Sequence, residues 1–314
     1  MTEEIALTAA DVAKLLKISK NTVYELIKRG DINSYKVGRK IRFTQADVDA
    51  YVGAGKTLQA PPSILPLNNP PYAGTLPTVP NDFVICGQDL MLDILSTYLG
   101  QQSPSTRALR AYTGSYSSLV ALYQNSVHMA SAHLWDADAN LYNIPHAKSL
   151  LPGIPVVIIH LTCRMQGFYV AKGNPKRIHT WEDLTKPGIT LINREKGAGS
   201  RVLLDEHLRR LGVYGSSIAG YDRETQSHLT VASTVGRGGA DVAVGNEKIA
   251  SQVENIEFIP LQKERYELVV KQEMMETPAV QTVLQILQSR EFQMQFEGIG
   301  GYDTSEMGKI VASW

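Results

Sequence analysis

The sequence predicts two domains of different fold class, a small, mainly α domain followed by a larger α/β domain. Short amphipathic helices with clear capping signals occupy residues 1–52, whereas short apolar strands alternate with helices from residue 82 onward. Between them, residues 53–81 hold seven of the chain's fifteen prolines. Because proline blocks regular backbone hydrogen bonding, this segment predicts an extended linker. We therefore expect domains at residues 1–52 and 82–314.

The bulk composition is that of an ordinary soluble protein, with 43% hydrophobic and 20% charged residues. Its 31 basic and 31 acidic side chains balance, so any nucleic-acid surface must be local. The start of the chain is acidic and lacks a long apolar run, which predicts a cytoplasmic protein without a membrane span. Cys86 and Cys163 lie far apart in apolar surroundings, and we expect reduced core thiols rather than a disulfide or metal ligands.

The first 52 residues show the order of elements of a winged helix-turn-helix. Thr8 and Asp11 form a capping box that opens one helix, and Ser19 caps a second helix after a tight turn. Alternating apolar and basic residues at 34–44 then predict a hairpin, or wing. A second capping box at 44–47 opens a third helix.

Positive charge is concentrated in this domain, with nine lysines and arginines between residues 14 and 42 against two acids. In a helix-turn-helix the second helix presents its first residues to base edges, while a basic wing contacts phosphates or the minor groove. A solvated basic surface is the plain alternative. The predicted DNA contacts are Ser19, Lys20, Asn21, Thr22, Tyr24 and Lys28 on the helix, and Arg39, Lys40 and Arg42 on the wing.

Residues 5–52 resemble the excisionase-type helix-turn-helix domain, a relative of MerR-type modules, most clearly in the stretches 13–16, 19–24 and 38–42. The resemblance implies a transcriptional regulator that binds a double-stranded DNA operator. Because one such module reads few base pairs, we expect a homodimer that binds two half-sites. A phage-type DNA architectural factor is an alternative, but it leaves more than 200 following residues unexplained.

From residue 82 the pattern predicts an α/β domain. Its expected strands are 83–86, 109–112, 127–134, 155–161, 167–171 and 189–192, and its expected helices include 90–99, 118–124 and 200–211. Four glycine-containing turns stand out, at 87–89, 113–116, 197–201 and 236–239. A single turn of this kind is common between a strand and a helix. Four of them in one domain predict that the turns meet at one anion site, because exposed amides at helix N-termini attract anions.

The same region resembles the type II periplasmic-binding-protein-like domain, and in general plan the molybdate- and tungstate-binding type. The stretches that carry this resemblance are 132–136, 164–168, 173–175, 193–201, 220–224 and 264–268. It implies two lobes joined by crossing strands with a ligand between them. The first lobe would take residues 82 to about 163 plus the C-terminal part, and the second about 164 to 258.

The predicted effector is a small anion, either an oxyanion or a compound related to the molybdenum cofactor. Asp89 favours the larger compound, because a carboxylate beside a bare dianion is electrostatically unfavourable. We expect the anionic group at Gly199–Arg201, unless Arg201 instead pairs with Asp205 along its own helix. The predicted ligand-binding residues are Gln88, Asp89, Gly114, Ser115, Tyr116, His133, Gly199, Ser200 and Arg201.

An enzyme built on the same fold is the rival function. The sequence contains no nucleophile elbow, zinc-protease motif or cysteine nucleophile with obvious partners. His128 and His133 are expected on opposite faces of one strand, where they cannot share a metal, and His133 could equally be a core or surface residue. We therefore expect no catalytic residue, no metal site and no cofactor.

Overall fold

The computed structural model describes residues 6–29, 32–38, 40–48, 51 and 81–314. The chain divides into two compact units, residues 1–71 and 72–314, and each is described here by itself. Residues 53–80 of the predicted linker lie outside the described residues. The linker and the domain boundaries therefore stay predictions.

The N-terminal unit contains the predicted helix-turn-helix and wing. Helix α1 (Ala9–Leu16) has the predicted capping box, and helix α2 (Lys20–Arg29) follows a turn in which Lys17 is left-handed, with φ 53°. Strands β1 (Tyr35–Val37) and β2 (Lys40–Arg42) pair antiparallel as the wing. Residues 45–48 are helical behind the second capping box. A small core holds the elements together, and it includes Val12, Val23, Leu26, Phe43 and Val48.

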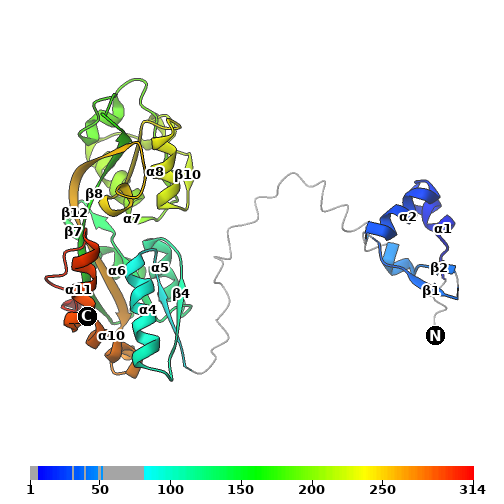
Figure 1. Cartoon of the computed structure of the whole chain (residues 1–314), viewed down its shortest axis with the longest axis horizontal. Helices are drawn as coiled ribbons and strands as arrows, with labels where there is room; N and C mark the ends of the chain where they lie inside the picture. The colour runs from blue at the N-terminus through cyan, green and yellow to red at the C-terminus, as the bar shows by residue number, and fades with distance from the viewer. Residues whose placement is uncertain (1–5, 30–31, 39, 49–50, 52–80) are drawn as a thin grey trace. The chain divides into compact units, whose positions relative to one another are not determined.

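The larger unit is an α/β structure with two lobes (Figure 1). Its seven-stranded sheet has the order β11-β8-β12-β5-β3-β4, with β13 also on β8. The first-lobe elements are β3 (Asp82–Cys86), α4 (Leu90–Gln102), β4 (Arg107–Ala111), α5 (Ser115–Tyr123), β5 (Met129–Ala132), α6 (Ile144–Leu150), η3 (Gln272–Met274), α10 (Pro278–Gln288), α11 (Arg290–Ile299) and β13 (Ile310–Ser313). Strands β4, β3 and β5 are parallel, so their carboxyl ends meet at one edge.

The second lobe is built from shorter elements. They are η1 (Trp181–Thr185), β9 (Asn193–Arg194), α7 (Gly199–Leu211), η2 (Gly215–Ser217), β10 (Glu224–Thr225), α8 (His228–Gly236), β11 (Val242–Asn246) and α9 (Glu247–Ala250). A short arm, β6 (Trp135–Asp136) and β7 (Leu141–Tyr142), leaves the first lobe and packs on α7. There the Trp135 ring stacks on His207, with centroids 4.5 Å apart.

Two long antiparallel strands, β8 (Val156–Ala171) and β12 (Ile256–Lys271), run through both lobes. The sequence predicted two separate strands, 155–161 and 167–171, and that prediction was wrong. In the sequence, the polar residues between these two segments resemble a loop. In the structure Arg164 and Gln166 are buried and bond to Glu264 on β12, and the pairing of β8 with β12 continues through them. The register shifts between Pro260 and Gln262 and between Tyr266 and Glu267.

The core of the larger unit lies on both faces of the sheet. Leucines and phenylalanines of α4, α10 and α11 cover one face in the first lobe, while α5 and α6 cover the other. Both cysteines, Cys86 and Cys163, are buried and free, as predicted. No helix among the described residues is long and apolar enough to cross a membrane.

Candidate functional site

The exposed face of α2 carries four of the nine predicted DNA contacts. Lys20, Asn21 and Lys28 are exposed, and the Tyr24 ring is 43% exposed. This face of α2 is exposed because Val23 and Leu26, on the opposite side of the helix, are buried in the small core.

Other predicted contacts are tied to the structure of the domain itself. The Ser19 hydroxyl accepts from the Thr22 amide at 3.1 Å, and the two hydroxyls lie 2.8 Å apart. The Ser19 side chain therefore caps α2, and the Thr22 hydroxyl is bonded to it. On the wing, Lys40 is exposed and Arg42 is half-buried, donating to the Ile41 carbonyl at 3.0 Å. Arg39 lies outside the described residues.

In the larger unit, three of the four glycine-containing turns meet at one cavity between the lobes. The cavity measures about 20 Å³, room for about one water molecule. The fourth turn, 236–239, lies at the opposite end of α8 from His228, which reaches the cavity with its ring. The lining residues are Gln88, Thr113, Gly114, Ser115, Ser131, His133, Arg164, Ala198, Gly199, His228 and Tyr266.

The two lobes touch closely around this cavity. The Tyr116 amide donates to the Gly197 carbonyl at 3.0 Å, and Arg194 Nη2 donates to Gln88 Oε1 at 2.7 Å, both across the cleft. A Cβ atom on Gly199 would lie only 2.4 Å from the His133 ring. The structure therefore describes a closed cleft.

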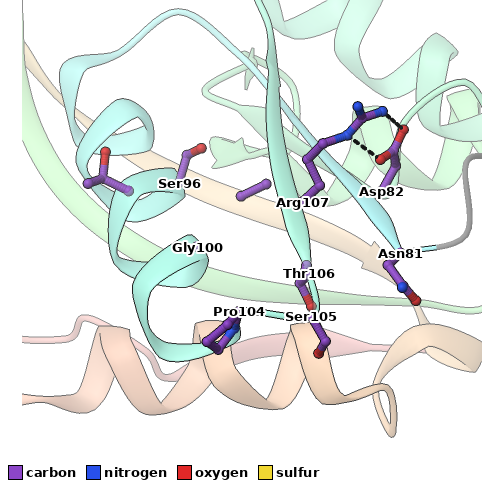
Figure 2. A pocket seen from close by; sticks show the side chains of 10 residues that line it. Asn81, Asp82, Ser96, Gly100, Pro104, Ser105, Thr106 and Arg107 are labelled. Atoms are coloured by element: carbon purple, nitrogen blue, oxygen red, sulfur yellow. Dashed lines mark hydrogen bonds and ion pairs between the residues drawn. The ribbon is translucent and has the colours of Figure 1, made fainter.

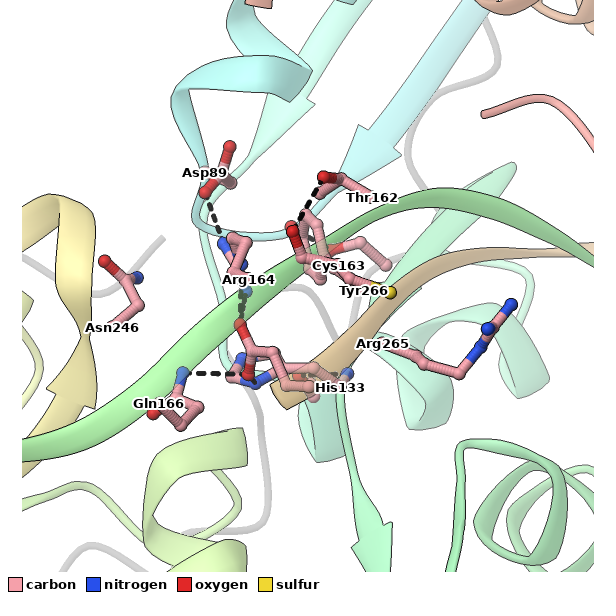
Figure 3. Close-up of polar contacts among 12 residues, drawn as sticks. Asp89, His133, Thr162, Cys163, Arg164, Gln166, Asn246, Arg265 and Tyr266 are labelled. Carbon is pink, nitrogen blue, oxygen red and sulfur yellow. Dashed lines mark hydrogen bonds and ion pairs between the residues drawn. The ribbon is translucent and has the colours of Figure 1, made fainter. Parts of the chain in front are cut away.

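A buried charge network forms one wall, where β8 and β12 cross between the lobes (Figure 3). The Arg164 guanidinium lies between Asp89 and Glu264, 2.5 Å from Glu264 Oε1, and 4.1 Å above the Tyr266 ring. Glu264 also accepts from His133 Nδ1 at 2.6 Å. Burial alone would raise the pKa of Glu264, but Arg164 and His133 together lower it to about 2. Glu264 is therefore a carboxylate at neutral pH.

Four buried side-chain atoms have no hydrogen-bond partner among the described residues; one belongs to a residue that lines this cavity, and the other three belong to residues that adjoin or bond to residues around it. They are Gln166 Oε1, Arg194 Nη1, Ser200 Oγ and His228 Nδ1. His228 lines the cavity, Ser200 follows Gly199, Arg194 donates to Gln88, and Gln166 shares Glu264 with His133. An unpaired buried polar atom costs about 1–3 kcal/mol, so their concentration at one place calls for an explanation.

Burial also fixes the state of His228. The loss of solvent lowers the pKa of its imidazole well below the usual value, and Arg194 lowers it further. The ring is therefore neutral, and one of its nitrogens can accept a hydrogen bond.

The structure brings together six of the nine predicted ligand residues, because Gln88, Gly114, Ser115, His133 and Gly199 line the cavity and Ser200 adjoins it. Asp89 is instead held by Arg164 and by the Met91 amide at 2.7 Å. Tyr116 contributes its backbone to the cleft contact, while its side chain is 44% exposed.

Arg201 does not face the cavity, contrary to the main expectation. Its Nε lies 3.1 Å from Asp205 Oδ1, the pairing that the sequence left open, and its guanidinium lies 4.1 Å above the Tyr221 ring. The Arg201 side chain is fully buried and the Asp205 side chain is 40% exposed, so the pair lies where the lobe's interior meets its surface. Because Arg201 and Asp205 are four residues apart on one helix, their side chains are neighbours without any ligand.

Several residues in or next to the cavity wall were not predicted: Arg164, His228 and Tyr266 line the cavity, and Arg194 and Glu264 bond to residues that line it. Arg164, Arg194, Glu264 and Tyr266 fall in stretches that carry the family resemblance, which was the available signal. Nothing in the local sequence distinguishes His228, because only the packing of α8 brings its ring to the cavity.

A second hollow of about 630 Å³ lies away from the cleft, between α4 and the starts of β3 and β4 (Figure 2). An exposed ion pair lines it, with Arg107 Nε 2.6 Å from Asp82 Oδ1. None of the unpaired buried atoms found in the described residues lies there. The cleft is therefore the stronger candidate site. Within those residues no group of three or more metal-binding side chains is found.

Two α/β lobes joined by crossing strands, with a polar cavity between them, define the class of periplasmic-binding-protein-like ligand-binding domains. The chain belongs to this family: the PBP superfamily domain model matches residues 96–288. A helix-turn-helix domain model matches residues 6–56. The predicted helix-turn-helix domain, the predicted periplasmic-binding-protein-like domain and the predicted fold class are thus confirmed, while the molybdate- and tungstate-binding type stays a prediction.

The chain is also similar to proteins of two bacteria. It is 38% identical over 313 residues to the uncharacterized protein YvgK of Bacillus subtilis (strain 168), covering 99% of each chain. It is 61% identical over 110 residues to an uncharacterized protein encoded in the 5′ region of the ferredoxin 2Fe-2S gene of Clostridium pasteurianum, covering 35% of this chain and 97% of that protein.

Solved structures support the fold. A putative phosphate transporter substrate-binding protein from Clostridium perfringens, with bound phosphate, superposes with a TM-score of 0.53 at 12% identity, covering 71% of this chain and 99% of that one. EhuB in complex with hydroxyectoine gives a TM-score of 0.53 at 10% identity, covering 73% and 93%. At such low identity these similarities show the fold alone.

Proposed function

We propose that this protein is a transcriptional regulator whose DNA binding responds to a small anionic ligand in the cleft of the larger unit. The helix-turn-helix and the binding-protein fold suggest a ligand-sensing DNA-binding protein rather than an enzyme. The observation that carries the proposal is a polar cavity between two lobes, with unpaired buried polar atoms in His228, which lines it, and in residues next to its lining.

The electrostatics of the cavity favour an anion. The N-termini of α5 and α7 face each other there, and neither has a side-chain cap; of the first amides, that of Tyr116 already donates to the Gly197 carbonyl. Arg194 Nη1 and Ser200 Oγ add two unpaired groups that can donate. An oxyanion and a compound related to the molybdenum cofactor are the two effector classes that the sequence proposed.

Closure supplies the regulatory step. Groups from both lobes line the cavity, so a ligand there contacts both lobes only when the cleft is closed. A ligand shifts such an equilibrium only as far as it prefers one state, and regulation of DNA binding requires that the two states differ in operator affinity. We place the regulator in the cytoplasm as a homodimer, and sedimentation at operator-binding concentrations tests the dimer.

Ligand binding is tested with protein purified from its own host and analysed by native mass spectrometry. We expect a retained small anion in the wild-type protein and its loss from Ser200→Ala and Arg194→Ala. Ser305→Ala, on the exposed loop before β13, is the control and should keep the ligand. Equal retention by all variants would contradict the proposed site.

DNA binding is tested with Lys20→Ala, Asn21→Ala and Arg42→Ala combined. We expect a loss of operator affinity, with a base contact contributing about 1–3 kcal/mol and each lost phosphate contact reducing the salt slope by about 0.9. A double variant with Lys172→Ala and Arg237→Ala removes two exposed charges from the other unit and should bind as wild type. Unchanged affinity of the triple variant would defeat the assignment.

A further inference from the structure

The imidazole of His228 lies against the cavity of the closed cleft. His228 is the first residue of α8, and its ring is part of the cavity lining. The Nδ1 atom is buried and has no hydrogen-bond partner among the described residues. The first turn of a helix carries partial positive charge, which disfavours a cation there. The position therefore favours the neutral imidazole.

The charged groups around this ring come from the second lobe, the first lobe and the crossing strands. The groups that act on it most are basic, namely Arg194 of β9, His133 after β5 and Arg164 of β8. The carboxylates beside them are already bound, Asp89 and Glu264 to Arg164, Glu264 also to His133, and Glu195 to Arg194. A proton on His228 would add a cation beside two guanidinium groups, while the carboxylates of this wall already bind other cations.

The elements that pack on the rest of α8 have their charged groups bound elsewhere. Strand β11 carries no titratable residue, and Glu224 of β10 lies 3.9 Å from Arg201. On α9, Lys248 donates to the Ile299 carbonyl at 2.7 Å, and Glu247 is exposed to solvent. The charge state of His228 is therefore set on the cleft side of the helix.

Separation of the lobes changes these surroundings. His133 moves away with the first lobe and water reaches the ring, while Arg194 stays beside His228 because both belong to the second lobe. Loss of solvent is the largest cause that lowers the pKa of His228 well below 6.5 in the closed cleft. The open form therefore takes up a proton at a higher pH than the closed form, so that acid favours the open form.

We propose that His228 makes closure of the cleft sensitive to pH: the lobes close while its imidazole is neutral and separate when it takes up a proton. This pH switch is a property of the cleft itself. Its consequence for DNA binding rests on the proposed function, in which closure changes operator affinity.

The test is hydrogen exchange of the Tyr116 amide in the full chain, because this amide donates to Gly197 across the cleft. Its protection factor is compared at about pH 7.5 and about pH 5.5, on either side of the usual imidazole pKa. We expect protection to fall roughly three- to tenfold at the lower pH, because uptake of one proton by the open form alone changes the equilibrium by at most about tenfold per pH unit. In His228→Gln, whose amide takes up no proton, protection should be equal at both pH values.

His179→Gln is the matched control, because His179 belongs to the same lobe and is exposed, and this variant should lose protection as the wild type does. The Ile192 amide donates to the Val242 carbonyl within the second lobe, so it reports unfolding of that lobe. Equal protection of the Tyr116 amide at both pH values in the wild type overturns the proposal. A loss that persists in His228→Gln, or that the Ile192 amide shares, overturns it as well. The measurement uses neither ligand nor operator, so its failure leaves the proposed function standing, and failure of ligand or DNA binding leaves the pH switch standing.

Discussion

The contact of Gly199 with His133 makes closure of the cleft directly measurable. A Cβ on Gly199 would lie 2.4 Å from the His133 ring, a distance that side chains do not tolerate. The ring cannot easily withdraw, because Glu264 holds its Nδ1 at 2.6 Å. Gly199 has no positive φ, so α7 itself accepts alanine at this position. Gly199→Ala should therefore wedge the lobes apart without damaging either lobe.

The expected magnitude follows from the cost of overpacking, about 1–3 kcal/mol, which lowers the population of the closed form relative to the open form approximately 5- to 150-fold. The Tyr116 amide reports this population, because it donates to Gly197 across the cleft and exchanges with solvent when the lobes separate. We expect its hydrogen-exchange protection to fall by that factor in Gly199→Ala.

Gly100→Ala on α4 is the control, since an added Cβ there meets nothing within 4 Å. Protection of the Tyr116 amide should be unchanged in this variant. Wild-type protection in Gly199→Ala would refute the reasoning, because it would mean that the closed cleft accommodates the extra carbon.

Three further predictions concern stability. Asn143→Ala removes a buried amide that bonds to the Leu134 amide and the Glu267 carboxylate, both at 2.8 Å, and should cost roughly 2–4 kcal/mol in urea denaturation; a change below about 0.5 kcal/mol would contradict this. Because the pKa of Glu264 is lowered from 4.5 to about 2, its contribution to the free energy of unfolding is present above pH 4.5 and is lost as the pH falls toward 2. Glu264→Gln should therefore flatten the dependence of stability on pH in this range, and an unchanged dependence would count against the prediction. Burial lowers the pKa of His207, so stability should decline as the pH falls below 6.5, and His207→Leu should remove that decline when melting temperature is followed against pH.

The N-terminal unit was predictable because its signals are local. The capping boxes at residues 8–11 and 44–47 and the cap at Ser19 each involve residues three apart in the chain, and all three are present. The wing follows from alternation around a glycine, and β1 and β2 pair in that register. Local hydrogen bonding therefore carries most of the information in this part of the chain.

The cleft was only partly predictable because its polar residues take their roles from distant partners. Arg164 and Gln166 resemble a break in a strand until Glu264, about a hundred residues later, pairs with both. Conversely, Arg201 follows a helix N-terminus, as an anion ligand would, yet its neighbour Asp205 holds it. A side chain's direction depends on the nearest opposite charge in the folded chain, and spacing alone does not reveal it.

The two strands that cross both lobes also constrain the order in which the protein can form during synthesis. Strand β8 finds its central partner only when β12 emerges near the end of the chain, and the first lobe is completed by α10, α11 and β13 after that. The helix-turn-helix is translated far earlier, and its core uses no residue beyond Tyr51 among those described. Domains generally fold as units as they leave the ribosome. Each newly made chain therefore passes through a period in which its DNA-binding helices can be folded while its cleft does not yet exist.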